Sequence, residues 1–164
     1  MKEYSKANRV ETLQKPPVKP EEQMQSAKMR ETASLYLAVC AGSVIGSVLR
    51  ALSSLAALAW FGAGFPWATL FVNVVGSFVI GFYATLTGPG GRMMVPTRQR
   101  QFVMTGVCGG FTTFSTFSLE TLMLARNGDL PLAGLNVLVS IVTWLLAVWL
   151  GHMLAVRLNR LGGV

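Results

Sequence analysis

Residues 106–120 read GVCGGFTTFSTFSLE, a glycine pair followed by alternating hydroxyls and phenylalanines. This segment lies inside a stretch that is otherwise apolar enough to cross a bilayer. Polar side chains and helix-breaking residues are costly in hydrocarbon unless protein buries them or they line a path. We therefore expect a small polar ligand to contact this segment.

The rest of the sequence is typical of a membrane protein. Of the 164 residues, 52% are hydrophobic and 13% are charged. Four apolar segments reach or exceed the roughly 20 residues that a helix needs to span the hydrocarbon. They cover residues 33–61, 65–87, 101–125 and 132–156. We predict an all-α membrane protein with four transmembrane helices and short connections.

The charged residues suggest how the chain is organised and oriented. Residues 1–32 mix Lys, Glu, Gln and Pro, so we predict a disordered tail there, a membrane domain over 33–158 and a short tail over 159–164. Lysine and arginine near helix ends mark the cytoplasmic side. Most of them fall on the side of the two termini, which we predict to be cytoplasmic. We attribute the net charge of +7 to this orientation bias and not to nucleic-acid binding.

The side chains needed for catalysis are scarce. After residue 32 the only acidic residues are Glu120 and Asp129, and the only histidine is His152. The chain therefore lacks the set of side chains that acid–base or nucleophilic catalysis requires. Cys40 and Cys108 lie in apolar stretches without metal-ligand spacing. We predict that the chain is not an enzyme.

The glycine pair permits a break in the third helix at Gly109-Gly110, and the hydroxyls and phenylalanines that follow it favour this break over an unbroken helix. A break leaves carbonyls unpaired on the first half and amides unpaired on the second. Free carbonyls can ligate a small cation such as sodium, and the positive start of the second half attracts an anion. The alternative is an unbroken helix whose glycines serve close packing. Gly42 and Gly46 in the first helix have the small-residue spacing that is typical of such packing.

Five polar or aromatic residues are candidates for an ion path. Phe114 and Phe117 share a helix face, and although such pairs are usually core, their positive ring edges could face an anion. Asn73 in the second helix either ties two helices together or points its donors at an ion. We expect Arg50 and Glu120 near helix ends, in watery vestibules or in structural roles.

Three stretches together resemble the bacterial fluoride channel family, known as Fluc or CrcB, over residues 35–156. They are GSVIGSVLR at 42–50, TLFVNVVGSFVIG at 69–81 and GVCGGFTTFSTFS at 106–118. The resemblance implies passive, selective export of fluoride from the cytoplasm through an antiparallel dimer of the dual-topology type. In the fourth helix, Asn136 and Trp144 depart from the family's pattern.

The resemblance also implies roles for individual residues. A structural sodium ion at the dimer centre, which is not transported, would be held by the backbone carbonyls of Gly109 and Thr112 from each subunit. The fluoride pathway would be lined by Asn73, Phe114, Phe117, Thr116 and Ser140. The location implied is the bacterial cytoplasmic membrane.

The partner and the function leave alternatives open. The lysine and arginine bias favours one orientation, so the chain pairs either with a sister subunit of opposite orientation or with itself. A small multidrug-type four-helix exporter is a second possible function, although the first helix lacks the carboxylate that proton coupling needs. A non-transporting membrane scaffold is a third.

Overall fold

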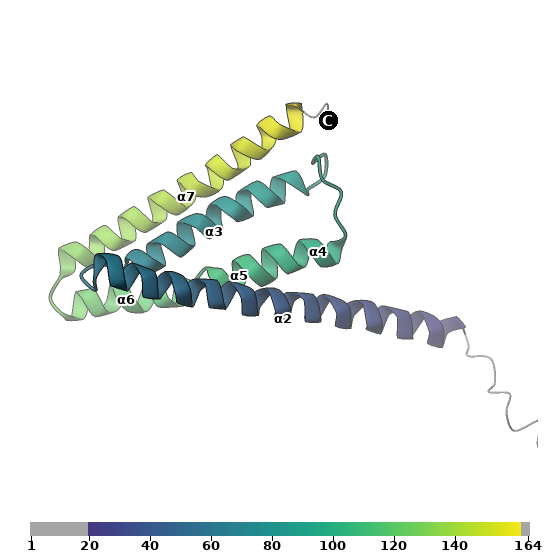
Figure 1. The fold of residues 1–164 in the computed structure, drawn as a ribbon, viewed down its shortest axis with the longest axis horizontal. Coiled ribbons are helices and arrows are strands. Elements are labelled where there is room, and N and C mark those ends of the chain that lie inside the picture. Colours follow the sequence, from purple (N-terminus) through teal and green to yellow (C-terminus); the bar gives the residue numbers. More distant parts are fainter. Residues whose placement is uncertain (1–19, 162–164) are drawn as a thin grey trace, which may run out of the picture. The chain divides into compact units, whose positions relative to one another are not determined.

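The computed structural model describes residues 20–161, and every regular element in this part of the chain is a helix. Four spans are long and apolar enough to cross a membrane, as predicted. They are α2 (Pro20–Phe61), α3 (Trp67–Leu86), a third span (Thr97–Arg126) and α7 (Leu130–Leu161) (Figure 1). The third span consists of α4 (Thr97–Gln101), the π-helix η2 (Phe102–Cys108), α5 (Gly109–Phe111) and α6 (Phe114–Arg126).

α2 begins at Pro20, well before the apolar segment that was predicted to start at residue 33. Proline suits the first helical turn, where an N–H would have no partner, and Glu21 and Glu22 place negative charge at the positive helix end. Residues 20–32, which we expected to be disordered, are therefore helical. The remaining parts of the two predicted tails, residues 1–19 and 162–164, lie outside the described residues.

The chain divides into two compact units, of which the first ends at Ala33. In the second unit, α3 and α7 pack closely along their lengths (Figure 1). Two glycines permit this approach. A Cβ atom on Gly81 would collide with the carbonyl oxygen of Val148, and one on Gly151 would collide with that of Phe78. Small residues let two membrane helices bring their backbones close together, and this close approach strengthens the van der Waals packing between them.

α2 packs against the third span in the same way. A Cβ atom on Gly42 would lie 2.5 Å from the carbonyl oxygen of Phe102 and 2.9 Å from the Cα of Gly106. A Cβ atom on Gly46 would collide with the carbonyl oxygen of Val107. The packing role that the spacing of Gly42 and Gly46 predicted is thus confirmed.

The third span is interrupted at Thr112 and Thr113, not at the glycine pair. Gly109 has helical dihedral angles (φ −65°, ψ −36°), whereas Thr112 (φ −82°, ψ 159°) and Thr113 (φ −153°, ψ 123°) are extended. A Cβ atom on Gly110 would lie 2.5 Å from the carbonyl oxygen of Ser43, so this glycine serves close packing. The prediction of a break at Gly109-Gly110 is therefore wrong in position, because glycine permits a break without requiring one.

Candidate functional site

The interruption is held by a side chain of α3. The Nδ2 of Asn73 donates to the carbonyl oxygen of Thr113 (2.8 Å), and the backbone N–H of Thr113 donates to the Oδ1 of Asn73 (2.8 Å). Asn73 is only 5% exposed, so both bonds lie in the protein interior. The amide therefore replaces helical backbone partners and ties α3 to the third span. Because Nδ2 carries two hydrogens, one donor remains for another acceptor.

Thr113 also starts the second half of the span. Its Oγ1 accepts a hydrogen bond from the backbone N–H of Thr116 (3.1 Å) and donates one to the Oγ1 of Thr116 (3.0 Å). This is the N-cap arrangement that satisfies one of the unpaired amides of a first helical turn. The start of α6, with its partial positive charge, thus points at the interruption in the middle of the span.

The interruption frees the two carbonyls that were predicted to bind sodium. In a continuous helix the carbonyl of Gly109 would accept from the N–H of Thr113, and that of Thr112 from the N–H of Thr116. Those N–H groups donate to Asn73 and to the Thr113 hydroxyl instead. Main-chain oxygens released in this way suit a small cation such as sodium. The chemistry of the Gly109 and Thr112 carbonyls therefore fits a small cation.

Beside the interruption is a cavity of about 310 Å³, which we term the Asn73 cavity. Four of the predicted site residues line it, namely Asn73, Gly109, Thr112 and Phe114, together with other side chains of α3, η2 and α7. Its lining includes Asn73, Ser77, Met104, Gly109, Thr112, Phe114 and Trp144.

The two predicted pathway phenylalanines differ in environment. Phe114 is 72% exposed and lies on the rim of the Asn73 cavity, whereas Phe117 is 7% exposed. Their ring centroids are 5.7 Å apart with planes tilted by 46°. Phe117 also meets the ring of Trp144 edge to face, at 4.9 Å and 73°. Phe117 is therefore held by packing, while Phe114 is free to contact whatever occupies the surface beside it.

On the α2 side of the interruption is a second cavity, the Arg50 cavity, of about 270 Å³. The Nη1 of Arg50 donates to the carbonyl oxygen of Thr112 at 3.4 Å, a long contact. Six of the eight residues that line the Arg50 cavity are polar; the full set is Ser47, Arg50, Ala51, Ser54, Thr69, Val72, Thr113 and Thr116. The structure thus places Arg50 against the interruption.

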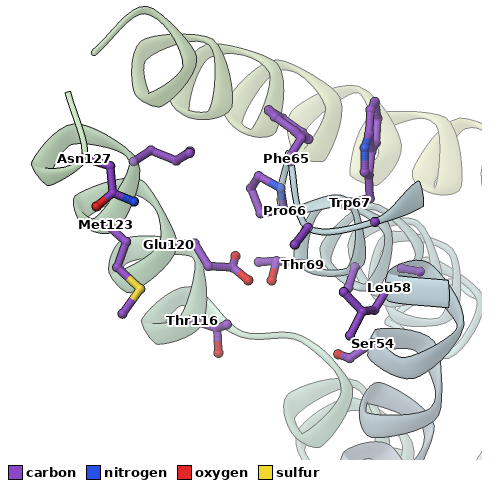
Figure 2. A pocket seen from close by; sticks show the side chains of 16 residues that line it. Ser54, Leu58, Phe65, Pro66, Trp67, Thr69, Thr116, Glu120, Met123 and Asn127 are labelled. Carbon is purple, nitrogen blue, oxygen red and sulfur yellow. The ribbon is translucent and has the colours of Figure 1, made fainter. Parts of the chain in front are cut away.

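A third cavity of about 400 Å³, the Glu120 cavity, shares Ser54, Thr69 and Thr116 with the Arg50 cavity, so the two adjoin. Figure 2 shows the Glu120 carboxylate pointing toward the Thr69 hydroxyl, with Thr116 below it and Asn127 at the far side. The Oε2 of Glu120 is buried without a hydrogen-bond partner among the described residues. A row of polar groups therefore leads from the interruption to the end of α6.

Ser140 and Asn136 lie together on α7, each 1% exposed. Ser140 donates to the Oδ1 of Asn136 (3.4 Å), and the Nδ2 of Asn136 donates to the Oγ1 of Thr121 on α6 (2.8 Å). Neither residue is among those that line the three cavities. Of the predicted pathway set, Ser140 and Phe117 line none of the three cavities, although Phe117 contacts Phe114, which does.

Sequence reasoning missed Ser54, Thr69 and the capping role of Thr113. A usable signal existed for Thr69, which precedes Asn73 by one helical turn and so shares its face. The capping role also had a signal, because threonine is a preferred N-cap residue and Thr113 directly precedes a helical run. Ser54 had none, since its hydroxyl donates to its own helix at the carbonyl of Arg50 (3.0 Å).

Comparison with known proteins identifies the family. The family model described as CrcB-like protein, Camphor Resistance (CrcB), matches residues 37–152. The chain belongs to this family. A relative from Rhodopseudomonas palustris (strain BisB18), named fluoride-specific ion channel FluC 1, is 60% identical over 136 residues, which are 83% of this chain and 96% of the relative.

Further CrcB relatives carry the same kind of name. The fluoride-specific ion channel FluC of Opitutus terrae is 62% identical over 131 residues, covering 79% of this chain and 98% of the relative. FluC 1 of Bradyrhizobium diazoefficiens is 56% identical over 136 residues, covering 83% and 94%. The resemblance stated from the sequence is thus confirmed, as is the prediction that the chain is not an enzyme. With four spans, this CrcB protein is a multi-pass membrane protein.

Proposed function

We propose that this CrcB protein is a passive, fluoride-selective channel that exports fluoride across the bacterial cytoplasmic membrane. The observation that carries the proposal is the interruption at Thr112 and Thr113, which Asn73 holds in the middle of a membrane span. Polar main chain at that depth is tolerated where it is buried in protein or lines a path. The relatives' name, fluoride-specific ion channel, supports the choice of ion.

The proposed route passes the polar groups on both sides of the interruption. In the Asn73 cavity, the remaining N–H of Asn73 and the ring edge of Phe114 are donors for an anion. In the Arg50 and Glu120 cavities, the hydroxyl of Thr116 continues the track. A small anion needs compact donors in place of water, and weak successive sites let it leave again. Phe117 and Ser140 complete the proposed set, with Phe117 fixing the position of its neighbour.

The proposed structural sodium ion would bind at the carbonyls of Gly109 and Thr112. When bound, it would supply a fixed positive charge that joins two chains at the interruption and is not itself transported. The carbonyl of Thr112 has two lone pairs, so its long contact with Arg50 leaves one for the ion. Gly109 is exposed on this chain, which is compatible with a second chain completing the ligand shell.

The proposed assembly is an antiparallel dimer with both termini of this chain in the cytoplasm. The charge bias supports one orientation for this chain, and hence a sister subunit of opposite orientation as its partner. Expression of the chain alone, in a host without relatives, separates this arrangement from a homodimer. We expect weak fluoride efflux from liposomes that contain the lone chain, whereas robust efflux would establish the homodimer.

The ion choice is tested in liposomes that contain the purified dimer. They are loaded with potassium fluoride, and a fluoride electrode follows release after a potassium ionophore removes the opposing voltage. We expect rapid fluoride release, and chloride release no faster than from protein-free liposomes. Equal release of the two halides would refute selectivity, and fluoride release that depends on a pH gradient would favour an exporter over a passive channel.

A further inference from the structure

Five arginines lie in the segments where α3 ends, α4 begins and α7 ends. The loop between α3 and α4 is tied to α7, because the backbone N–H of Arg92 donates to the Oδ1 of Asn159 (3.1 Å). The Nδ2 of Asn159 in turn donates to the carbonyl oxygen of Thr85 on α3 (3.4 Å). The arginines at this end are Arg92, Arg98, Arg100, Arg157 and Arg160.

No acidic side chain of the described second unit balances this charge locally. Its two acidic residues, Glu120 and Asp129, lie in α6 and in the turn that follows α6. Those positions are at the opposite end of the third span from α4. Within the second unit, the arginine-rich end is therefore a positive surface that attracts anions.

The loop at this end also forms a cavity of about 420 Å³. Arg100 is held on its wall, because its Nε donates to the Oγ1 of Thr87 (3.3 Å), which itself donates to the carbonyl of Tyr83 (2.7 Å). This bond uses only the Nε, so neither Nη group of Arg100 is needed to hold the side chain in place. A guanidinium fixed in this way presents a fork that matches a phosphate group. The remaining lining includes Gly88, Gly91, Met93, Met94, Val95, Thr97 and Gln101.

The same loop exposes apolar side chains next to its arginines. Met94 is 100% exposed and Met93 is 43% exposed, and both lie between Arg92 and Arg98. A free inorganic anion would gain no favourable contact from these apolar methionine side chains. At the boundary of a bilayer, however, they can contact acyl chains while arginines contact the headgroups.

We propose that this surface is a binding site for an anionic phospholipid. The lipid phosphate lies against the guanidinium of Arg100 on the cavity wall, Arg92, which precedes Met93 in the loop, adds positive charge, and the acyl chains lie against Met93 and Met94. Basic pockets near the ends of membrane helices bind anionic lipid headgroups by this combination of charge and apolar contact. The site is separate from the proposed ion route, so its test does not depend on fluoride conduction.

The test measures lipid-dependent stability of the full-length protein in detergent. Tryptophan fluorescence follows thermal unfolding while phosphatidylglycerol, phosphatidylcholine or inorganic phosphate is titrated. We expect phosphatidylglycerol alone to raise the unfolding midpoint. Arg92→Gln and Arg100→Gln should each raise its half-saturating concentration about fivefold, whereas the control Arg126→Gln, at the other end of the third span, should change it less than about twofold.

Three other outcomes would each overturn the proposal. Equal stabilisation by phosphatidylcholine would mean that the headgroup charge is not recognised. Stabilisation by inorganic phosphate would identify a free anion as the ligand instead of a lipid. Arg100→Gln also removes the bond to Thr87, so Arg92→Gln, which leaves the backbone bond to Asn159 in place, separates lost binding from a damaged fold. An equal loss in Arg126→Gln would mean that only total charge matters.

Discussion

The side-chain amide of Asn73 and the main chain of Thr113 form two hydrogen bonds of 2.8 Å each, in which Asn73 takes the place of helical neighbours. The N–H and carbonyl of Thr113, a residue that is only 8% exposed, would otherwise be unpaired in the protein interior. Each orphaned polar group costs about 1–3 kcal/mol. The position of the interruption is therefore fixed by a residue 40 positions earlier in the chain.

Replacement of Asn73 tests this directly. We expect Asn73→Ala to lower the free energy of unfolding by about 2–4 kcal/mol, because both groups of Thr113 lose their partner. Denaturant titration in detergent measures the change. Ser77→Ala, one turn along α3 in the same cavity, is the matched control and should cost less than about 0.5 kcal/mol. An Asn73→Ala protein as stable as the parent would show that the interruption has another cause.

Phe114 offers a test of the ion route that is separate from stability. It is 72% exposed on this chain, so Phe114→Ala should leave the fold of a subunit intact. We expect fluoride efflux from liposomes to fall about tenfold or more, which corresponds to about 1.4 kcal/mol of lost stabilisation along the route. Phe71→Ala, at a 54% exposed position on α3, is the control and should keep the parental rate. Unchanged flux with Phe114→Ala would argue that the ring edges do not contact the anion.

The glycine contacts of α2 predict a large effect from one methyl group. Gly46→Ala places a Cβ atom against the carbonyl of Val107, and we expect it to destabilise the protein by about 1–3 kcal/mol. Gly134→Ala on α7 is the matched control, because a Cβ atom there meets nothing within 4 Å. It should be neutral or slightly stabilising, since alanine favours helix. Thermal unfolding of both variants decides the matter, and equal midpoints would contradict close packing at Gly46.

Exchange of cations tests the proposed sodium ion. Replacing sodium by N-methylglucamine should lower the unfolding midpoint of the dimer, because an ion present at about a hundred times its Kd stabilises the folded state by about 2.7 kcal/mol. Thr112→Ala keeps the carbonyl and should keep the sodium dependence. A midpoint that is the same in all monovalent cations would rule the ion out as a structural component.

The spans and their packing glycines could be predicted from the sequence, because length, hydropathy and small-residue spacing are properties of single segments. The position of the interruption could not. It depends on Asn73 pairing with Thr113 across two helices, and neither residue signals its partner. The glycine pair was misleading because Gly110 serves contact with Ser43. The start of α2 was missed because its first turns are polar, and hydropathy detects only the part of a helix that lies in hydrocarbon.

The π-helical turn η2 has a mechanical consequence. It is wider than an α-helical turn, and α2 can lie against it because Gly42 and Gly46 face Phe102, Gly106 and Val107. A shift of α2 by one turn in one direction would press Arg50 against Val107. The span that carries the interruption is thus clamped by α2 from one side and by α3 from another, which makes helix sliding a poor means of opening or closing. The proposed channel would therefore have no sliding helix as a gate.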